Sequence, residues 1–124
     1  MIVGLQDVYY YVKDMRRAVA FYRDTLGLRL LSESDHWSVF DVGGVRLGLH
    51  TAGGNVIRSS PDENGIYAGA TVTLKVRDIR REVERLQRAG VNFMGELLDE
   101  PFGILGAFKD PDGNVIKLME PKPA

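Results

Sequence analysis

This 124-residue chain contains two histidines and no cysteine. Because there is no cysteine, disulfides, thiolate metal sites and thiol catalysis are all excluded. Of the two histidines, His36 lies in a polar stretch before a predicted strand and is expected to be solvated. His50 ends a predicted strand. Histidine is the residue type used most often for acid–base chemistry near neutral pH. It could serve as a general base or as a hydrogen-bonding group at the rim of a site.

Aromatic residues offer a second kind of chemistry, which is stacking. Tyr9, Tyr10 and Tyr11 are consecutive, and Trp37 is the chain's single tryptophan. Tyrosine runs more often fill cores and interfaces than surround a ligand, and a tryptophan at a strand start suits packing as well as ligand contact. Both interpretations stay open from the sequence.

Composition excludes several classes of function. Sixteen basic and seventeen acidic residues give a net charge of −1, without the basic excess of a nucleic-acid-binding protein. No apolar run approaches the roughly 18 residues of a membrane span, and no signal-peptide pattern precedes the first predicted strand. There is no Gly-x-Ser-x-Gly elbow and no phosphate-binding loop. We expect a cytoplasmic protein without nucleic-acid or membrane partners.

The chain repeats itself. Val12-Lys13-Asp14-Met15-Arg16-Arg17-Ala18-Val19 returns as Val76-Arg77-Asp78-Ile79-Arg80-Arg81-Glu82-Val83, an offset of 64 (76 − 12). Gly44 to Leu49 is similarly matched by Gly113 to Leu118, an offset of 69 (113 − 44). Such self-similarity predicts two half-length modules related by a pseudo-twofold.

The first module reads as β-α-β-β-β over about residues 1–51. A strand is expected over Leu5–Val12, then a helix that Asp14 caps and Gly27 ends. Its remaining strands are expected at Leu28–Ser32, Trp37–Val42 and Val45–His50, the last two joined by a tight hairpin.

Residues of about 52–69 are rich in turn signals and are predicted to connect the modules. The second module, about 70–121, repeats the element order. Asp78 caps its helix, Gly90 ends it, and Asp110-Pro111-Asp112-Gly113 forms its last hairpin. Its strands are expected at Ala70–Val76, Val91–Met94, Leu105–Lys109 and Val115–Glu120.

Three segments resemble the vicinal oxygen chelate superfamily, which contains glyoxalase I, extradiol dioxygenases, fosfomycin-resistance proteins and bleomycin-binding proteins. They are Val12 to Met15, Ala20-Phe21-Tyr22-Arg23-Asp24-Thr25-Leu26-Gly27-Leu28, and Phe108-Lys109-Asp110-Pro111-Asp112-Gly113-Asn114. The resemblance implies an α+β fold of two βαβββ modules in tandem, forming an open eight-stranded cup with the helices packed outside. It implies one glyoxalase/bleomycin-resistance-like domain over 1–124, and commonly a homodimer.

Enzymes of the superfamily hold one divalent metal at the cup floor, on four strand positions that usually carry His, Glu or Gln. Counting from the matched segments, these positions fall on Asp7, Gly48, Thr71 and Lys117. Of this set only Asp7 ligates a divalent ion well, whereas a catalytic site ordinarily has about three His or carboxylate ligands. His50 could join Asp7 but would leave a third ligand missing. We therefore expect no metal site and no cofactor.

Strand alternation carried from these positions predicts the cup lining. The residues expected to bind a ligand are Tyr9, Tyr11, Trp37, Arg46, Thr73, Phe102, Lys117 and Met119. Phe102 lies in the loop Glu100–Gly103, which is expected to overhang the rim. Lys117 is expected to replace the charge of the metal and to pair with Asp7 or with an anionic group of the ligand.

Three functions fit these residues. The first is a metal-independent protein that binds a small aromatic or anionic molecule, as the bleomycin-binding relatives do. The second is an enzyme: a glyoxalase-type lyase or isomerase, a dioxygenase, or a metal-free acid–base catalyst using Asp7 or His50. The third is an interaction module whose cup is filled by its own side chains. The absence of metal ligands favours the first.

Overall fold

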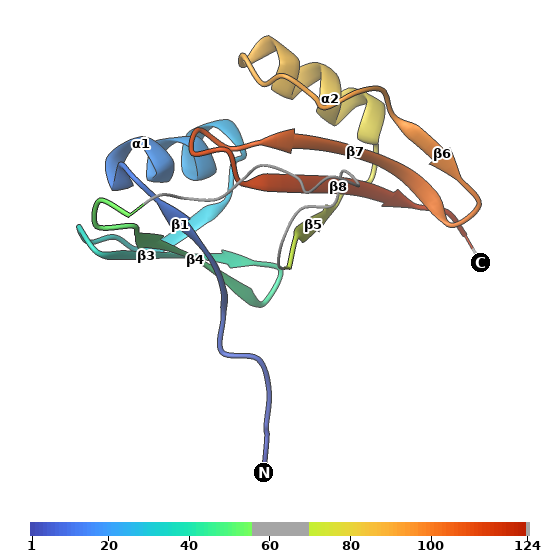
Figure 1. Ribbon diagram of the computed structural model, residues 1–124. Helices are drawn as coiled ribbons and strands as arrows, with labels where there is room; N and C mark the ends of the chain where they lie inside the picture. Colours follow the sequence, from blue (N-terminus) through green and yellow to red (C-terminus); the bar gives the residue numbers. More distant parts are fainter. Residues whose placement is uncertain (56–69, 124) are drawn as a thin grey trace. The chain divides into compact units, whose positions relative to one another are not determined.

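The computed structural model describes residues 1–55 and 70–123 and divides the chain into two compact units, Met1–Arg58 and Ser59–Ala124. Each unit has one four-stranded mixed sheet with helix on one face (Figure 1). The predicted α+β fold of tandem βαβββ modules is confirmed. No helix in the described ranges is long and apolar enough to cross a membrane.

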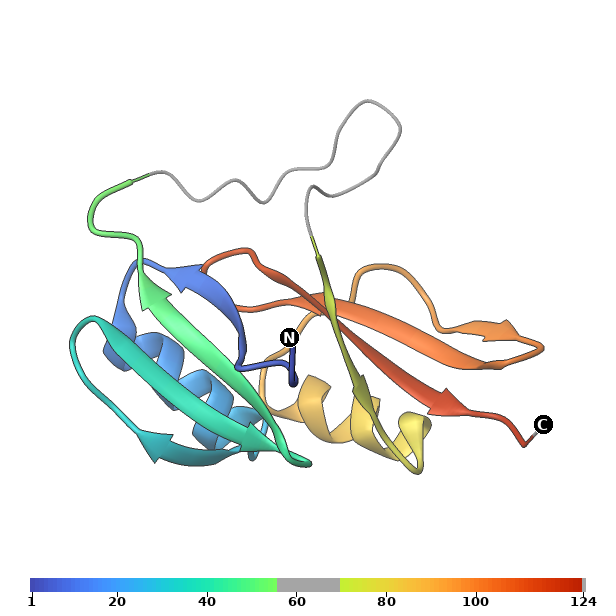
Figure 2. The same ribbon diagram turned by 90° about the horizontal axis from the view of Figure 1, so that it is seen from below.

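In the first unit the strand order is β1-β4-β3-β2 (Figure 2). The strands are β1 (Val8–Val12), β2 (Arg29–Ser32), β3 (Trp37–Val42) and β4 (Val45–Thr51). β1 runs parallel to β4, and the other pairs are antiparallel. β1 begins three residues later than predicted, so Asp7 precedes it.

The helix of the first unit covers one face of this sheet. α1 (Met15–Ala20) starts at Asp14, whose carboxylate accepts a hydrogen bond from the amide of Arg17 at 3.2 Å. It continues as a π-helix, η1 (Phe21–Thr25), and Gly27 follows with a φ of 76°. The helix packs on β3 and β4, where Phe40, Leu47 and Leu49 are buried. Alternate residues of these strands therefore face away from the helix.

The second unit repeats the plan with the order β5-β8-β7-β6. Its elements are β5 (Val72–Lys75), α2 (Ile79–Arg88), β6 (Leu98–Glu100), β7 (Gly103–Lys109) and β8 (Val115–Pro121). Asp78 caps α2 as Asp14 caps α1. Of the predicted connection at 52–69, residues 56–69 lie outside the described residues, and the module boundaries stay a prediction.

The predicted strand Val91–Met94 is wrong. There Phe93 makes only an isolated bridge to Phe108, and their rings lie 5.3 Å apart. Val91 and Phe108 are buried and Phe93 is half-buried against Phe108. The apolar residues of this segment therefore serve side-chain packing and do not form a strand. The edge strand is the more polar β6, which pairs with β7.

Candidate ligand-binding surface

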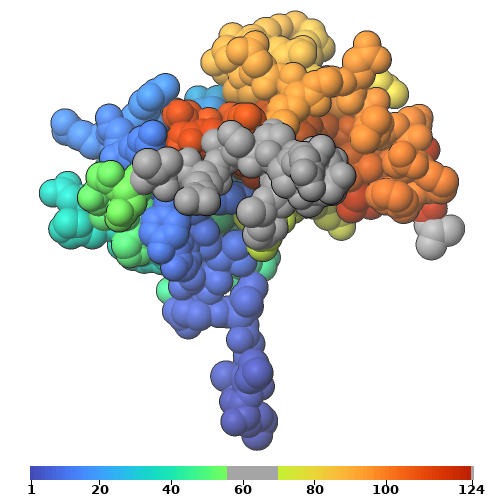
Figure 3. Space-filling model, in the orientation of Figure 1, coloured from blue at the N-terminus to red at the C-terminus, as the bar shows by residue number. Residues whose placement is uncertain are grey.

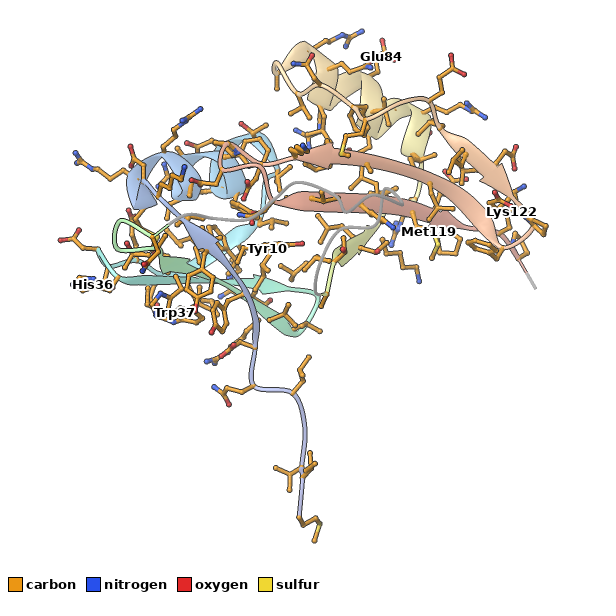
Figure 4. The ribbon with its side chains drawn as sticks, viewed as in Figure 1. Tyr10, His36, Trp37, Glu84, Met119 and Lys122 are labelled. Carbon is orange, nitrogen blue, oxygen red and sulfur yellow. The ribbon has the colours of Figure 1, made fainter. Side chains whose placement is uncertain are left out.

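The helix-free face of the first sheet carries four of the predicted site residues. Tyr9 pairs with Gly48 and Tyr11 with His50 across β1 and β4, and Trp37 pairs with His50 across β3 and β4. Because partners across a sheet point to the same face, these side chains form one surface. Trp37 points away from α1, as Figure 4 shows.

The four rings contact one another. Tyr9 lies 5.6 Å from Tyr11, 5.6 Å from Trp37 and 5.8 Å from His50 between ring centroids. Tyr11 lies 5.3 Å from His50, and Trp37 lies 6.2 Å from it. Most pairs are edge-to-face, an arrangement favoured by the ring quadrupoles. We call Tyr9, Tyr11, Trp37 and His50 the aromatic cluster.

Gly48 makes room for this arrangement. A Cβ atom added at Gly48 would lie 2.6 Å from Cζ2 and 2.7 Å from Cζ3 of Trp37. The indole therefore lies directly over the glycine, at the position where the resemblance places a metal ligand. The sequence located both residues but not their contact, since alternation fixes the face of a side chain and not its rotamer.

The cluster is open to solvent. Tyr9 is 45% exposed and Tyr11 is 49% exposed, whereas Trp37 and His50 are half-buried. Core aromatics of the same unit, such as Tyr22 and Phe40, are fully buried on the helix side. Tyr9 and Tyr11 therefore do not serve as core filling in this unit. An exposed group of stacked rings can bind a flat apolar group.

The hydroxyl groups of Tyr9 and Tyr11 are linked. A side-chain hydrogen bond with Tyr11 raises the pKa of Tyr9 above the ordinary tyrosine value, and smaller contributions come from the charges of Tyr11 and Asp7. The neutral phenol of Tyr9 is thereby favoured, so at neutral pH it presents a hydroxyl group to a ligand.

His50 has a defined tautomer. Its Nδ1 lies 2.8 Å from the carbonyl oxygen of Thr51, and a carbonyl can only accept. Nδ1 therefore donates, which leaves the lone pair of the neutral ring on Nε2. His36 is exposed, as expected, and its backbone carbonyl accepts from Thr51.

Two charged residues of the first unit were also predicted to belong to the site, and they lie beside the aromatic cluster. Asp7 is half-buried immediately before β1, and its charge influences Tyr9. Arg46 is exposed on β4, two residues before Gly48 and on the same face. Asp41 is the partner of Arg46 across β3 and β4, and Arg29 is the partner of Asp41 across β2 and β3, so both share this face. The surface thus combines rings with carboxylate and guanidinium groups.

The candidates of the second unit lie on the helix-free side of its own sheet. Thr73 pairs with Lys117 across β5 and β8, and both are exposed. Met119 lies two residues further along β8 and is half-buried. Phe102 is 60% exposed in the turn between β6 and β7. The predicted overhang of this turn, and the predicted cup, stay predictions.

The donor set does not fit a divalent metal. Asp7 is a good ligand, but Gly48 has no donor atom and is covered by the indole of Trp37. Thr71 precedes β5, and Lys117 carries a positive charge. Within residues 1–55 and 70–123, no three His, Cys, Asp or Glu side chains are grouped to hold an ion.

Comparison with known proteins agrees with this fold. The sequence pattern of the Glyoxalase/Bleomycin resistance protein/Dioxygenase superfamily matches residues 4–118. The chain belongs to this superfamily. A protein named metallothiol transferase FosB from Staphylococcus saprophyticus is 30% identical over 122 residues, 95% of this chain and 77% of that protein.

Two further relatives differ in how much of the chain they match. A FosB from Staphylococcus haemolyticus is 38% identical over 50 residues, which are 40% of this chain and 36% of that protein. The match thus spans about a third of that relative. The solved structure of TnmS3, an antibiotic binding protein from Streptomyces sp. CB03234, is 27% identical with a TM-score of 0.73, covering 98% of both chains.

Proposed function

We propose that this superfamily member binds a small aromatic or anionic molecule and does so without a metal ion. The observation that carries the proposal is the aromatic cluster, with Trp37 lying over Gly48. Exposed rings held edge-to-face offer a preformed surface for a flat ligand. The similarity to an antibiotic binding protein over nearly the whole chain supports the same class of function.

The polar groups beside the rings would orient the ligand. Tyr9 can donate through its hydroxyl, His50 can accept through Nε2, and Arg46 can pair with an anionic group. In the second unit, Thr73, Lys117 and Met119 lie on the corresponding helix-free face, and Phe102 is exposed in the turn between β6 and β7. We include them among the proposed ligand-binding residues.

Trp37 is the only tryptophan and so reports directly on this surface. The test is a panel of planar aromatic molecules, with and without a carboxylate, screened by tryptophan fluorescence and thermal shift. A ligand at 100 times its dissociation constant should stabilise the protein by about 2.7 kcal/mol. The variants Trp37→Phe and Tyr9→Ala should weaken binding, whereas His36→Gln, on an exposed residue outside the cluster, should not. Binding that is unaffected by changes in the cluster would overturn the proposal.

Catalysis is the second candidate function, and one observation favours it. The Nδ1–H of His50 donates to Thr51, so Nε2 is left as a base on the same face as Tyr9. A relative named as a transferase supports the same class. In this alternative, His50 or Asp7 would abstract a proton in a lyase, isomerase or dioxygenase reaction.

The two candidates differ in what happens to the ligand. A binding protein returns it intact after incubation, whereas an enzyme converts it at a rate that His50→Gln or Asp7→Asn lowers. Mass analysis of the recovered ligand separates them, with His36→Gln as the matched control. Conversion that depends on His50 would replace the binding proposal.

We further propose a cytoplasmic homodimer. The absence of cysteine suits a reducing compartment, and superfamily resemblance supports a dimer. Light scattering coupled to gel filtration should give twice the 13.8 kDa chain mass. A monomeric mass would contradict the proposed dimer but not the proposed ligand binding.

A further inference from the structure

The helix-free face of the second sheet is identified by a single long-range contact. Glu120 accepts a hydrogen bond at 2.9 Å from the amide of Ile79, the first residue of α2. Residue 120 of β8 therefore points toward the helix, together with the buried Ile116 and Leu118. By alternation, Lys117 and Met119 point to the opposite face.

Two lysines share that face. Thr73 pairs with Lys117, and Lys75 pairs with Met119, so Lys75 and Lys117 are diagonal neighbours on β5 and β8. Diagonal neighbours in a sheet lie about 7–8 Å apart, within reach of two flexible four-carbon side chains. Both ammonium groups can therefore contact the same small anion. Thr73, beside Lys117, adds a hydroxyl donor.

In the part of the chain that the structure describes, neither Lys75 nor Lys117 forms an ion pair. Two acids of β8 and its turn are engaged elsewhere, since Glu120 caps α2 and Asp110 accepts from the turn amides. Glu100 of β6 pairs with Gly103 of β7. The β7 partner of Lys117 is Ala107, which is four residues from Gly103. Glu100 and Lys117 are therefore separated by roughly 13 Å along the strand direction.

We infer that Lys117, Lys75 and Thr73 form a binding site for an oxyanion: the phosphate, phosphonate or carboxylate group of a small molecule. A compact ammonium suits such groups as a point charge, and two of them with a hydroxyl provide donors for several oxygens. Lys117 occupies a position where the resemblance places a metal ligand. Its ammonium group therefore supplies a positive charge at a position where other superfamily members have a side chain that binds a metal ion. This oxyanion site depends on the proposed function in one respect: the ligand is taken to bind to the helix-free faces of the sheets.

The site can be tested with inorganic phosphate alone. Titration of ¹⁵N-labelled protein at low ionic strength should shift the amides of Thr73, Lys75 and Lys117 saturably. Lys117→Gln and Lys75→Gln should each raise the dissociation constant about tenfold, and Lys117→Arg should retain binding. The matched control Lys13→Gln removes the same charge from the first unit and should leave the constant within about twofold. Dispersed amide spectra confirm that each variant folds.

Two outcomes would overturn the inference. One is the absence of saturable shifts at these amides. The other is an unchanged dissociation constant in Lys117→Gln, as expected if the lysines only protect the edge strand β5 from association. Binding of an uncharged aromatic molecule to the unaltered protein, followed by Trp37 fluorescence, separates this failure from that of the proposed function. If the aromatic molecule binds and phosphate does not, only the oxyanion site is lost.

Discussion

At Gly48 the first sheet has space for a hydrogen atom and not for a methyl group. The indole of Trp37 fills the volume that a Cβ would occupy. Gly48→Ala should therefore displace the indole and lose its contacts with Tyr9 and His50. We expect altered tryptophan fluorescence, weaker aromatic-ligand binding and a loss of about 1 kcal/mol in unfolding free energy.

The chain provides its own controls for this change. Among the residues that the structure describes, no atom lies within 4 Å of a Cβ added at Gly4, and the φ of Gly4 is not positive. Gly4→Ala should therefore leave fluorescence and ligand binding unchanged. In a Trp37→Ala background, Gly48→Ala should cost nothing more, because the clashing ring is gone. An equal effect of Gly48→Ala with and without Trp37 would contradict the contact.

The hydroxyl pair of the cluster predicts a response to pH. Because the hydrogen bond with Tyr11 raises the pKa of Tyr9, the folded protein favours the neutral phenol. This contribution to stability is present below the ordinary tyrosine value of about 10 and is lost as the pH rises through the raised value. Tyr11→Phe should lower the pKa of Tyr9, measured from the Cζ chemical shift of labelled tyrosine. A pKa of Tyr9 that Tyr11→Phe leaves unchanged would refute the link.

Ser38 places a polar hydroxyl group in the core of the first unit. It is fully buried on β3, and its hydroxyl has no hydrogen-bond partner among residues 1–55 and 70–123. Burying an unpaired hydroxyl costs free energy, so Ser38→Ala should leave stability unchanged or raise it by about 1 kcal/mol. Thermal unfolding checks this, and a clear loss of stability would reveal a partner for the hydroxyl.

At the scale of elements, the repeat is not symmetric in how its helices begin. Asp14 and Asp78 cap α1 and α2 in the same way, but α2 has a second capping group from β8, Glu120. Glu120→Ala should lower the unfolding free energy by about 1 kcal/mol, the usual value of a cap. Glu120→Gln keeps an acceptor oxygen and should lose less. Equal losses in denaturant titrations would exclude the hydrogen bond as the cause.

Most elements could be predicted because their signals are local. Asp14 and Asp78 fit N-caps, and Gly27 and Gly90 have the positive φ expected after a helix. β6 could not be predicted, because its polar sequence forms a strand only through pairing with β7. The widening of the first helix into η1 also has no local signal.

The sequence predicted which side chains share the helix-free face of the first sheet, but not how those side chains contact one another. Alternation placed Tyr9, Tyr11, Trp37 and His50 on one face, as the ring contacts show. The contact between Trp37 and Gly48 depends on the rotamer of the tryptophan side chain. The tautomer of His50 depends on its hydrogen bond to the carbonyl oxygen of Thr51. Both are tertiary features that residue type and spacing do not encode.

At the scale of the whole molecule, each unit repeats one plan but presents a different chemistry on its helix-free face. The first sheet carries rings and the second carries lysines. Both units expose apolar side chains, and the first extends Met1, Ile2, Val3 and Leu5 into solvent, as the narrow blue segment of Figure 3 shows. The duplicated frame has thus diverged in its surfaces while keeping its caps and strand order.

This divergence predicts how the whole molecule responds to metal removal. A superfamily site built on Asp7, Gly48, Thr71 and Lys117 has one good ligand, an indole over the second position and a cation at the fourth. Protein purified without chelators should therefore contain less than one divalent ion per chain by elemental analysis. Incubation with EDTA should change neither the melting temperature nor the dissociation constant of an aromatic ligand, relative to incubation in buffer alone. A stoichiometric ion whose removal lowers either quantity would show that other residues assemble a metal site, and the binding proposed here would then have to include it.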